Sequence, residues 1–214
     1  MPTAEPDSAA LRAAAMPLEP DRAVAATLAP VAAQPALLAL SAFAAEVRNV
    51  ARVVREPMMG EIRLQWWRDA LDILERGGTT GNPIADALGA EIRAHALPKG
   101  LLLGVIDGRA ADLDSEAPAD TRSLHVTLQK TEGALFALSA RVLGAIDDTR
   151  LQSAAHAAGR AYGLTRLLTD LPIALARGHL PLPRDAISAD LMATLCAGTI
   201  TPDAQMLLQS LASD

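Results

Sequence analysis

This sequence of 214 residues is short of aromatic side chains and of cysteine, and each shortage limits what the protein can be. Aromatic residues make up 2% of the chain, and Val and Ile are sparse beside abundant alanine. That composition favours helices over sheets. The single cysteine, Cys196, excludes an internal disulfide and fits a reducing compartment.

Long apolar runs and an excess of basic charge are also missing. No uninterrupted apolar run approaches the roughly 20 residues that a membrane-spanning helix needs, so we expect no transmembrane segment. A net charge of −6 argues against nucleic acid as the main partner. The first 20 residues match neither a signal peptide nor an Arg-rich transit peptide. We expect 1–20 to be a disordered arm and 21–214 to form one helical domain.

The clearest pattern lies between residues 37 and 76, where two long helices are predicted with a break at Glu56-Pro57. Apolar residues of the first helix recur every three or four positions and predict a buried stripe: Leu37, Leu40, Phe43, Val47, Val50 and Val54. Arg48 and Arg52 lie four residues apart on a second stripe beside it.

The second helix of this stretch, over 57–76, contains both tryptophans of the chain. Its predicted core face consists of Met58, Ile62, Trp66, Ala70, Ile73 and Leu74. Further helices are expected over 21–30, 83–95, 98–113, 121–144, 149–177, 186–196 and from 202 onwards. Pro172 is expected to kink or divide the longest of them. Since no segment shows a defensible strand pattern, the predicted fold is an all-α bundle of about eight helices.

Five segments in this order resemble the squalene/phytoene synthase family: residues 60–70 (GEIRLQWWRDA), 107–113 (DGRAADL), 131–135 (TEGAL), 163–170 (GLTRLLTD) and 177–183 (RGHLPLP). The resemblance covers roughly residues 35–183. It implies an isoprenoid-synthase fold, a multi-helix bundle around a central cavity. Because the family usually continues with further helices, the resemblance also implies a bundle shortened at its C-terminus.

Enzymes of this family join two prenyl diphosphates head to head. Two acidic motifs hold Mg²⁺ ions, and the metals offset the charge of the departing pyrophosphate. Where the first motif would carry aspartates, this sequence has Arg48, Asn49 and Arg52. In the second motif Asp170 remains and its partner position is Ala174. We therefore assign no catalytic residue and no cofactor, and Asp170 alone remains as a ligand should catalysis use Mg²⁺.

The two arginines of the first motif admit three interpretations. They form a solvated stripe, they bind an anionic group such as a diphosphate without metal, or they pair with Asp170 or Glu132 across the bundle. For the second interpretation, the candidate substrate-binding group consists of Arg48, Arg52, Arg63, Arg166, Asp170 and Arg177.

The leading hypothesis is a non-catalytic member, since the segment 60–69 is similar to the branch of mitochondrial complex I assembly factors. It would act in the cytoplasm or peripherally at the inner membrane, as a scaffold for membrane-associated protein partners. One alternative is an active prenyl transferase of the squalene/phytoene synthase type. The other is a module that binds a prenyl or lipid ligand in the cavity without chemistry.

Overall fold

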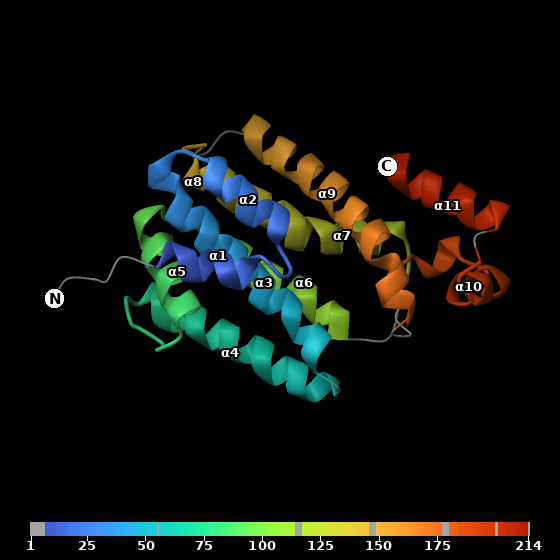
Figure 1. The fold of residues 1–214 in the computed structure, drawn as a ribbon, viewed down its shortest axis with the longest axis horizontal. Coiled ribbons are helices and arrows are strands. Elements are labelled where there is room, and N and C mark those ends of the chain that lie inside the picture. The colour runs from blue at the N-terminus through green and yellow to red at the C-terminus, as the bar shows by residue number, and fades with distance from the viewer. Residues whose placement is uncertain are drawn as a thin grey trace.

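The computed structural model describes residues 7–54, 56–113, 117–145, 149–176, 180–199 and 201–213, and within these ranges the regular structure is entirely helical (Figure 1). The α-helices are α1 (Ser8–Ala15), α2 (Pro20–Leu28), α3 (Gln34–Val53), α4 (Pro57–Glu75), α5 (Pro83–Ala94), α6 (Lys99–Ala110), α7 (Thr121–Leu128), α8 (Ala134–Val142), α9 (Thr149–Ala176), α10 (Ala189–Cys196) and α11 (Pro202–Ser213). A π-helical segment, η3 (Gln129–Gly133), joins α7 to α8.

The segment before residue 20 differs from the disordered arm that we expected. Helix α1 begins after Asp7, whose side chain accepts hydrogen bonds from the backbone N–H groups of Ala9 and Ala10. Leu11 and Ala15 are buried where α1 packs against α3. The prediction is therefore wrong for the part of the arm that the structure describes, because two apolar residues on one face of α1 are enough to dock it.

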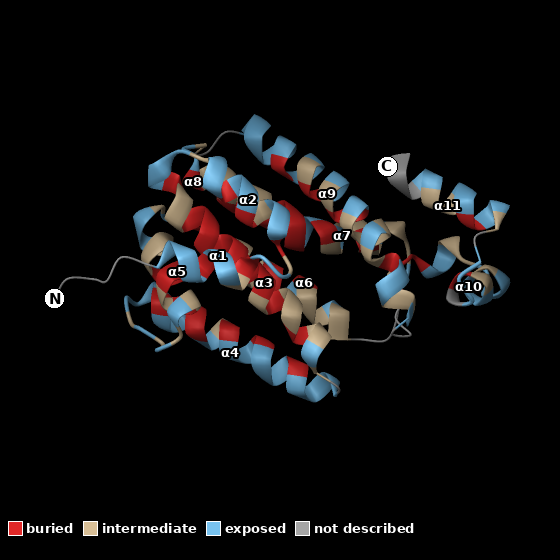
Figure 2. Cartoon of the chain, viewed as in Figure 1, coloured by how far each residue is buried: buried red, intermediate tan, exposed pale blue. Residues whose placement is uncertain are grey.

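Helix α3 runs through the middle of the bundle and contacts α1, α2, α4, α5, α6 and α8 (Figures 1 and 2). Its predicted stripe is confirmed from Leu37 to Val50, all of it buried, whereas Val54 is only half-buried. Alanines between the stripe residues are buried too, which allows neighbouring helices to approach on several sides.

The predicted core face of α4 is confirmed for Ala70 and Leu74 but is wrong for its other four residues. Met58, Ile62, Trp66 and Ile73 are exposed, whereas the buried residues are Gly60, Leu64, Trp67, Ala70, Leu71 and Leu74. Glycines decide which face is buried: a Cβ on Gly60 would lie 2.4 Å from Leu113 Cδ2, and one on Gly89 would lie 2.5 Å from Leu74 Cδ2. Close approach at these two glycines turns the other apolar face to solvent.

Helix α9 is continuous from Thr149 to Ala176 and includes Pro172, so the proline does not divide it. Beyond it, α10 and α11 pack against the C-terminal part of α9 and form a small separate apolar cluster around Leu171, Leu182 and Leu195. Figure 1 shows these two helices at one end of the molecule, away from α4 and α5. The main core lies outside this small cluster, whereas the pocket described below borders it through Ala117 and Leu167.

Candidate functional site

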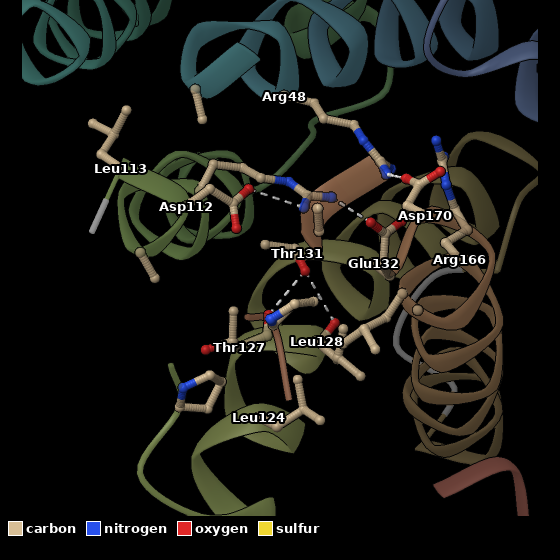
Figure 3. Close-up of a pocket in the computed structure, with 18 of the residues that line it drawn as sticks. Arg48, Asp112, Leu113, Leu124, Thr127, Leu128, Thr131, Glu132, Arg166 and Asp170 are labelled. Atoms are coloured by element: carbon tan, nitrogen blue, oxygen red, sulfur yellow. Dashed lines mark hydrogen bonds and ion pairs between the residues drawn. The ribbon is translucent and has the colours of Figure 1, made fainter. Parts of the chain in front are cut away.

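A pocket of about 890 Å³ opens between α3, α6, α7, η3 and α9 (Figure 3). Its apolar lining includes four leucines, namely Leu113, Leu124, Leu128 and Leu167. Its polar lining includes Arg48, Arg52, Arg109, Asp112, Glu132, Arg166 and Asp170. The pocket thus combines an apolar wall with a cluster of charged side chains.

Three glycines explain how this charged cluster is buried. A Cβ on Gly108 of α6 would lie 2.5 Å from Thr131 Cγ2, and one on Gly159 of α9 would lie 2.3 Å from Gly133 Cα. A Cβ on Gly163 would lie 3.3 Å from Glu132 Cγ. Because α6 and α9 approach η3 so closely, Glu132 is enclosed between them and is only 2% exposed.

Glu132 is held by arginines from two other helices. Its carboxylate accepts a hydrogen bond from Arg22 Nη2 at 2.7 Å and a second, short one from Arg109 Nη2. Arg109 also pairs with Asp112 at 3.3 Å. Burial by itself would raise the pKa of Glu132, but Arg109 and Arg22 lower that pKa to about 2. Glu132 is therefore ionised at neutral pH.

Glu19, just before α2, is the second buried carboxylate of the cluster and is 1% exposed. It accepts hydrogen bonds from Arg166 Nη1 at 2.6 Å and from Arg22 Nε at 3.1 Å, and it pairs with Arg48 Nη1 at 3.5 Å. Burial lowers the pKa of Arg166, but Glu19, Tyr162 and Glu132 together outweigh this and the pKa is raised overall. One carboxylate thus connects guanidinium groups from α2, α3 and α9.

Arg48 and Asp170 form a direct ion pair that joins α3 to α9 across the pocket (Figure 3). The two residues are 122 positions apart in the sequence. Of our three interpretations, pairing with Asp170 is confirmed for Arg48, and the solvated stripe is wrong because its side chain is only 12% exposed. Glu132, the other partner named in that interpretation, binds Arg22 and Arg109 instead. Burial lowers the pKa of Arg48, and the neighbouring Arg109 and Arg166 lower it further.

The other predicted site residues are only partly brought together. Arg52 and Ala174 line the pocket, and Arg52 has no ion pair with any residue that the structure describes. Asn49 is half-buried and does not line it. Arg63 is exposed on α4 and lies outside the pocket, so its assignment to the substrate-binding group is not supported by its position. Arg177 lies outside the described residues.

The sequence patterns did not single out Glu19 and Arg22, which complete the cluster. Arg22 also stacks over two rings, with its guanidinium carbon 4.9 Å from the centre of Phe136 and 4.7 Å from that of Tyr162. Glu19 lay in the segment expected to be disordered, and Arg22 follows it by three positions. Glu19 and Arg22 are three positions apart, a spacing that allows the ion pair that the structure shows between them. The same spacing is compatible with an exposed pair, so it does not by itself identify a buried one.

The carboxylates in and beside this pocket are all paired with guanidinium groups. Glu132, Asp112 and Asp170 line the pocket and Glu19 lies beside it, and the cations that the structure places at their oxygens are arginines. Across the described residues, His, Cys, Asp and Glu form no group of three or more with a metal-binding arrangement.

In the same part of the chain, none of the helices is both long and apolar enough to cross a membrane.

A family model described as squalene/phytoene synthase matches residues 19–214. The rat protein "NADH dehydrogenase (ubiquinone) complex I, assembly factor 6" is 32% identical over 158 residues, or 74% of this chain and 47% of that protein. Presqualene diphosphate synthase of Rhodopseudomonas palustris is 30% identical over 134 residues, or 62% of this chain and 46% of that protein. The chain thus spans about half the length of the curated relatives it matches.

Solved structures give the same fold. Squalene synthase HpnC from Alicyclobacillus acidocaldarius superposes with a TM-score of 0.81 over 96% of this chain and 80% of that one, at 18% identity. A dehydrosqualene synthase superposes with a TM-score of 0.80 over 97% of this chain and 72% of that one. At this low identity the similarity concerns the fold, and it confirms the all-α class expected from the sequence.

Proposed function

This chain belongs to the squalene/phytoene synthase family, and we propose that it is a non-catalytic member that serves as an assembly factor for a respiratory NADH dehydrogenase complex. In this proposal the helical bundle is retained as a scaffold. The metal-dependent transfer of prenyl groups is lost.

One observation carries the loss of catalysis: the ion pair between Arg48 and Asp170. These residues stand where the resemblance puts the two metal-binding motifs, on facing helices. A transferase needs those positions to collect Mg²⁺, which grips the diphosphate and offsets the charge of pyrophosphate as it leaves. Here a guanidinium supplies the positive charge permanently, and it is neutralised by Asp170 and Glu19. The cation that would activate a leaving group is therefore replaced by a structural pair.

The assembly role is supported by the names of similar proteins. The rat relative and a human relative at 28% identity are both called complex I assembly factor 6. By extension, we propose membrane-associated subunits of an NADH dehydrogenase as partners. We place the chain in the cytoplasm or peripherally at the inner membrane, where such subunits are assembled.

Catalysis is tested by incubating the purified protein with farnesyl diphosphate and Mg²⁺ and measuring pyrophosphate release. A variant that restores the acidic positions, Arg48→Asp/Asn49→Asp/Arg52→Asp/Ala174→Asp, runs beside it. We expect no release from the natural protein. Release that a chelator abolishes would overturn the proposal and support an active prenyl transferase, the activity named for the presqualene diphosphate synthase relatives.

The partner is tested by affinity purification of the tagged chain from its own host, followed by mass spectrometry. NADH dehydrogenase subunits should be enriched, and deletion of the chain should lower the amount of assembled NADH dehydrogenase on native gels. Unchanged assembly after deletion would contradict the proposed role, whatever the outcome of the pyrophosphate assay.

The pocket favours a second candidate, a prenyl or lipid ligand bound without chemistry. Its volume of about 890 Å³ and its apolar wall suit a branched hydrocarbon chain, and Arg52 lines the pocket without an ion pair to any described residue. Organic extraction of the purified protein and mass spectrometry of the extract test this candidate. Recovery of a stoichiometric lipid would support it, and an empty extract would count against it.

A further inference from the structure

The charges that line the large pocket do not balance. Its lining has four arginines and three acidic residues, namely Arg48, Arg52, Arg109 and Arg166 against Asp112, Glu132 and Asp170. Glu19 and Arg22 pair with these residues from beside the pocket, and their own charges cancel. Among the residues that the structure describes, the site therefore has an excess of one positive charge.

Arg52 carries this excess. Each of the other lining arginines has an ion pair with a carboxylate, whereas Arg52 has none within the described part of the chain. It lies in the last turn of α3, four positions after Arg48 on the same face of that helix, and it is only partly exposed. A cation in the last turn also stabilises a helix, but that role does not require a place in a pocket. The guanidinium of Arg52 is thus available to an anion that enters the pocket.

The rest of the lining gives room for a hydrocarbon chain. Figure 3 shows Arg48 and Asp170 on one side of the pocket and Leu124 on the other. The volume of about 890 Å³ lies within the range of ordinary small-molecule sites. A ligand that fills the pocket should therefore be amphiphilic, with its charged end towards α3 and its hydrocarbon chain towards α7.

The single excess charge limits the charge of that end. A carboxylate brings one negative charge and accepts two parallel hydrogen bonds from a guanidinium. A diphosphate brings more than one, and the further charges would enter next to Asp112 and Asp170 without a free cation to match them. Arg48 and Arg109 cannot supply that cation, because either would leave a carboxylate without its partner.

This inference rests on the second candidate function above, a ligand bound without chemistry. We propose that the ligand is a long-chain carboxylic acid, supplied either as a fatty acid or as an isoprenoid acid. Arg52 binds its carboxylate, and the apolar wall holds its chain. An alcohol with the same chain lacks the charge that Arg52 matches, and a diphosphate exceeds it. The pocket therefore selects its ligand by the charge of the head group.

The test uses three probes that share one hydrocarbon chain: farnesoic acid, farnesol and farnesyl diphosphate. Each is titrated into the intact chain by calorimetry, with EDTA present to remove divalent metal ions. Farnesoic acid should bind about tenfold or more tighter than farnesol, the gain expected for one charge-assisted pair, and tighter than farnesyl diphosphate. Palmitate runs beside them to assign the source. Tighter palmitate indicates a fatty acid and tighter farnesoic acid indicates an isoprenoid acid, and either order supports a carboxylate site.

Variants connect this preference to Arg52. Arg52→Gln should lower the affinity for farnesoic acid to that for farnesol and leave farnesol unchanged, whereas Arg52→Lys keeps the charge and should keep the preference for the acid. The matched control is Arg63→Gln, an exposed arginine of α4 outside the pocket, which should change neither affinity. Equal losses for the acid and the alcohol in Arg52→Gln, or equal effects of Arg52→Gln and Arg63→Gln, would overturn the proposal.

Two further results separate the failure of this inference from that of the function on which it rests. If farnesyl diphosphate binds as tightly as farnesoic acid, the carboxylate assignment is overturned and the ligand-binding candidate stands. If none of the probes binds, both are overturned. The assembly role is tested separately by deletion of the chain, so neither result decides it.

Discussion

The interior of this bundle has two parts that depend on different forces, and α3 contributes to both. One side of α3 buries Phe43, Val47 and Val50 in the main apolar core. The neighbouring side presents Arg48 to the cluster of paired charges around Glu19 and Glu132. Apolar burial stabilises the first part in proportion to the area removed from water. The second part is stable only while every charge keeps its partner.

If the chain is non-catalytic as proposed, this difference explains how the family fold persists without the family's chemistry. Removing metal ligands from a buried site would leave unbalanced charge and open space. In this chain the guanidinium groups of Arg22, Arg48, Arg109 and Arg166 meet carboxylates from four separate segments. The ionic cluster therefore holds together the helices that line the pocket.

The largest effect should come from removing one member of the ionic cluster. Glu132→Ala leaves Arg22 and Arg109 buried without this carboxylate, so we expect the free energy of unfolding to fall by about 3–5 kcal/mol. Urea denaturation followed by circular dichroism measures it. The matched control is Glu61→Ala, whose side chain is 52% exposed and whose loss should be small. Similar losses in both variants would contradict the contrast between cluster and surface.

A comparable loss is expected in the apolar core from Trp67→Ala. Trp67 is 4% exposed and packs edge-to-face on Phe43 with ring centres 5.1 Å apart. Truncation of a buried aromatic residue costs about 3–5 kcal/mol. Its neighbour Trp66 is 41% exposed, so Trp66→Ala should cost less than about 1 kcal/mol in the same urea experiment. The reverse order would support the core face predicted from sequence.

Acid should weaken the cluster while leaving the apolar core unaffected. The pKa of Glu132 is about 2 in the folded chain, below its ordinary value of about 4.3, so its contribution is complete above pH 4.3. That contribution is lost as the pH falls towards 2, and it amounts to about 3 kcal/mol. Urea midpoints between pH 5 and 2 should therefore fall more steeply for the natural chain than for Glu132→Gln. Parallel profiles would contradict the assigned ionisation.

The smallest effect is expected at a surface ion pair. Arg68 Nη2 lies 2.9 Å from Asp107, a bond as short as those of the cluster, but Asp107 is 54% exposed. Solvent screens such pairs, so Asp107→Asn should change the free energy of unfolding by less than about 1 kcal/mol. A loss as large as that of Glu132→Ala would mean that geometry, and not burial, determines the strength of these ion pairs.

The sequence predicted most of the helices correctly. It did not always predict which face of a helix is buried. The apolar stripe of α3 is unambiguous, and it is buried as predicted from Leu37 to Val50. Helix α4 has apolar residues on two faces, one through Ile62 and Trp66, the other through Leu64 and Trp67. Periodicity cannot choose between two such faces. The contact of Gly60 with Leu113, far along the chain, makes the choice.

The candidate site was predictable only in part, for a related reason. Resemblance to the family directed attention to Arg48 and Asp170, and pairing between them was one of three interpretations. Glu19 and Arg22 could not be assigned to the same cluster, because their partners lie more than 100 residues away on α9 and η3. Nothing local distinguishes a buried acid next to a helix from a solvated one.

The sequence by itself determined the helical class and the stripe of α3, since these follow from composition and local periodicity, and its resemblance to the family singled out Arg48, Asn49 and Arg52. Only the tertiary structure decided which face of α4 is buried and which charges meet in the pocket. Local periodicity reports on neighbours within one helix. The partner of a buried charge depends on where distant helices cross, and here the glycines of α6 and α9 set those crossings.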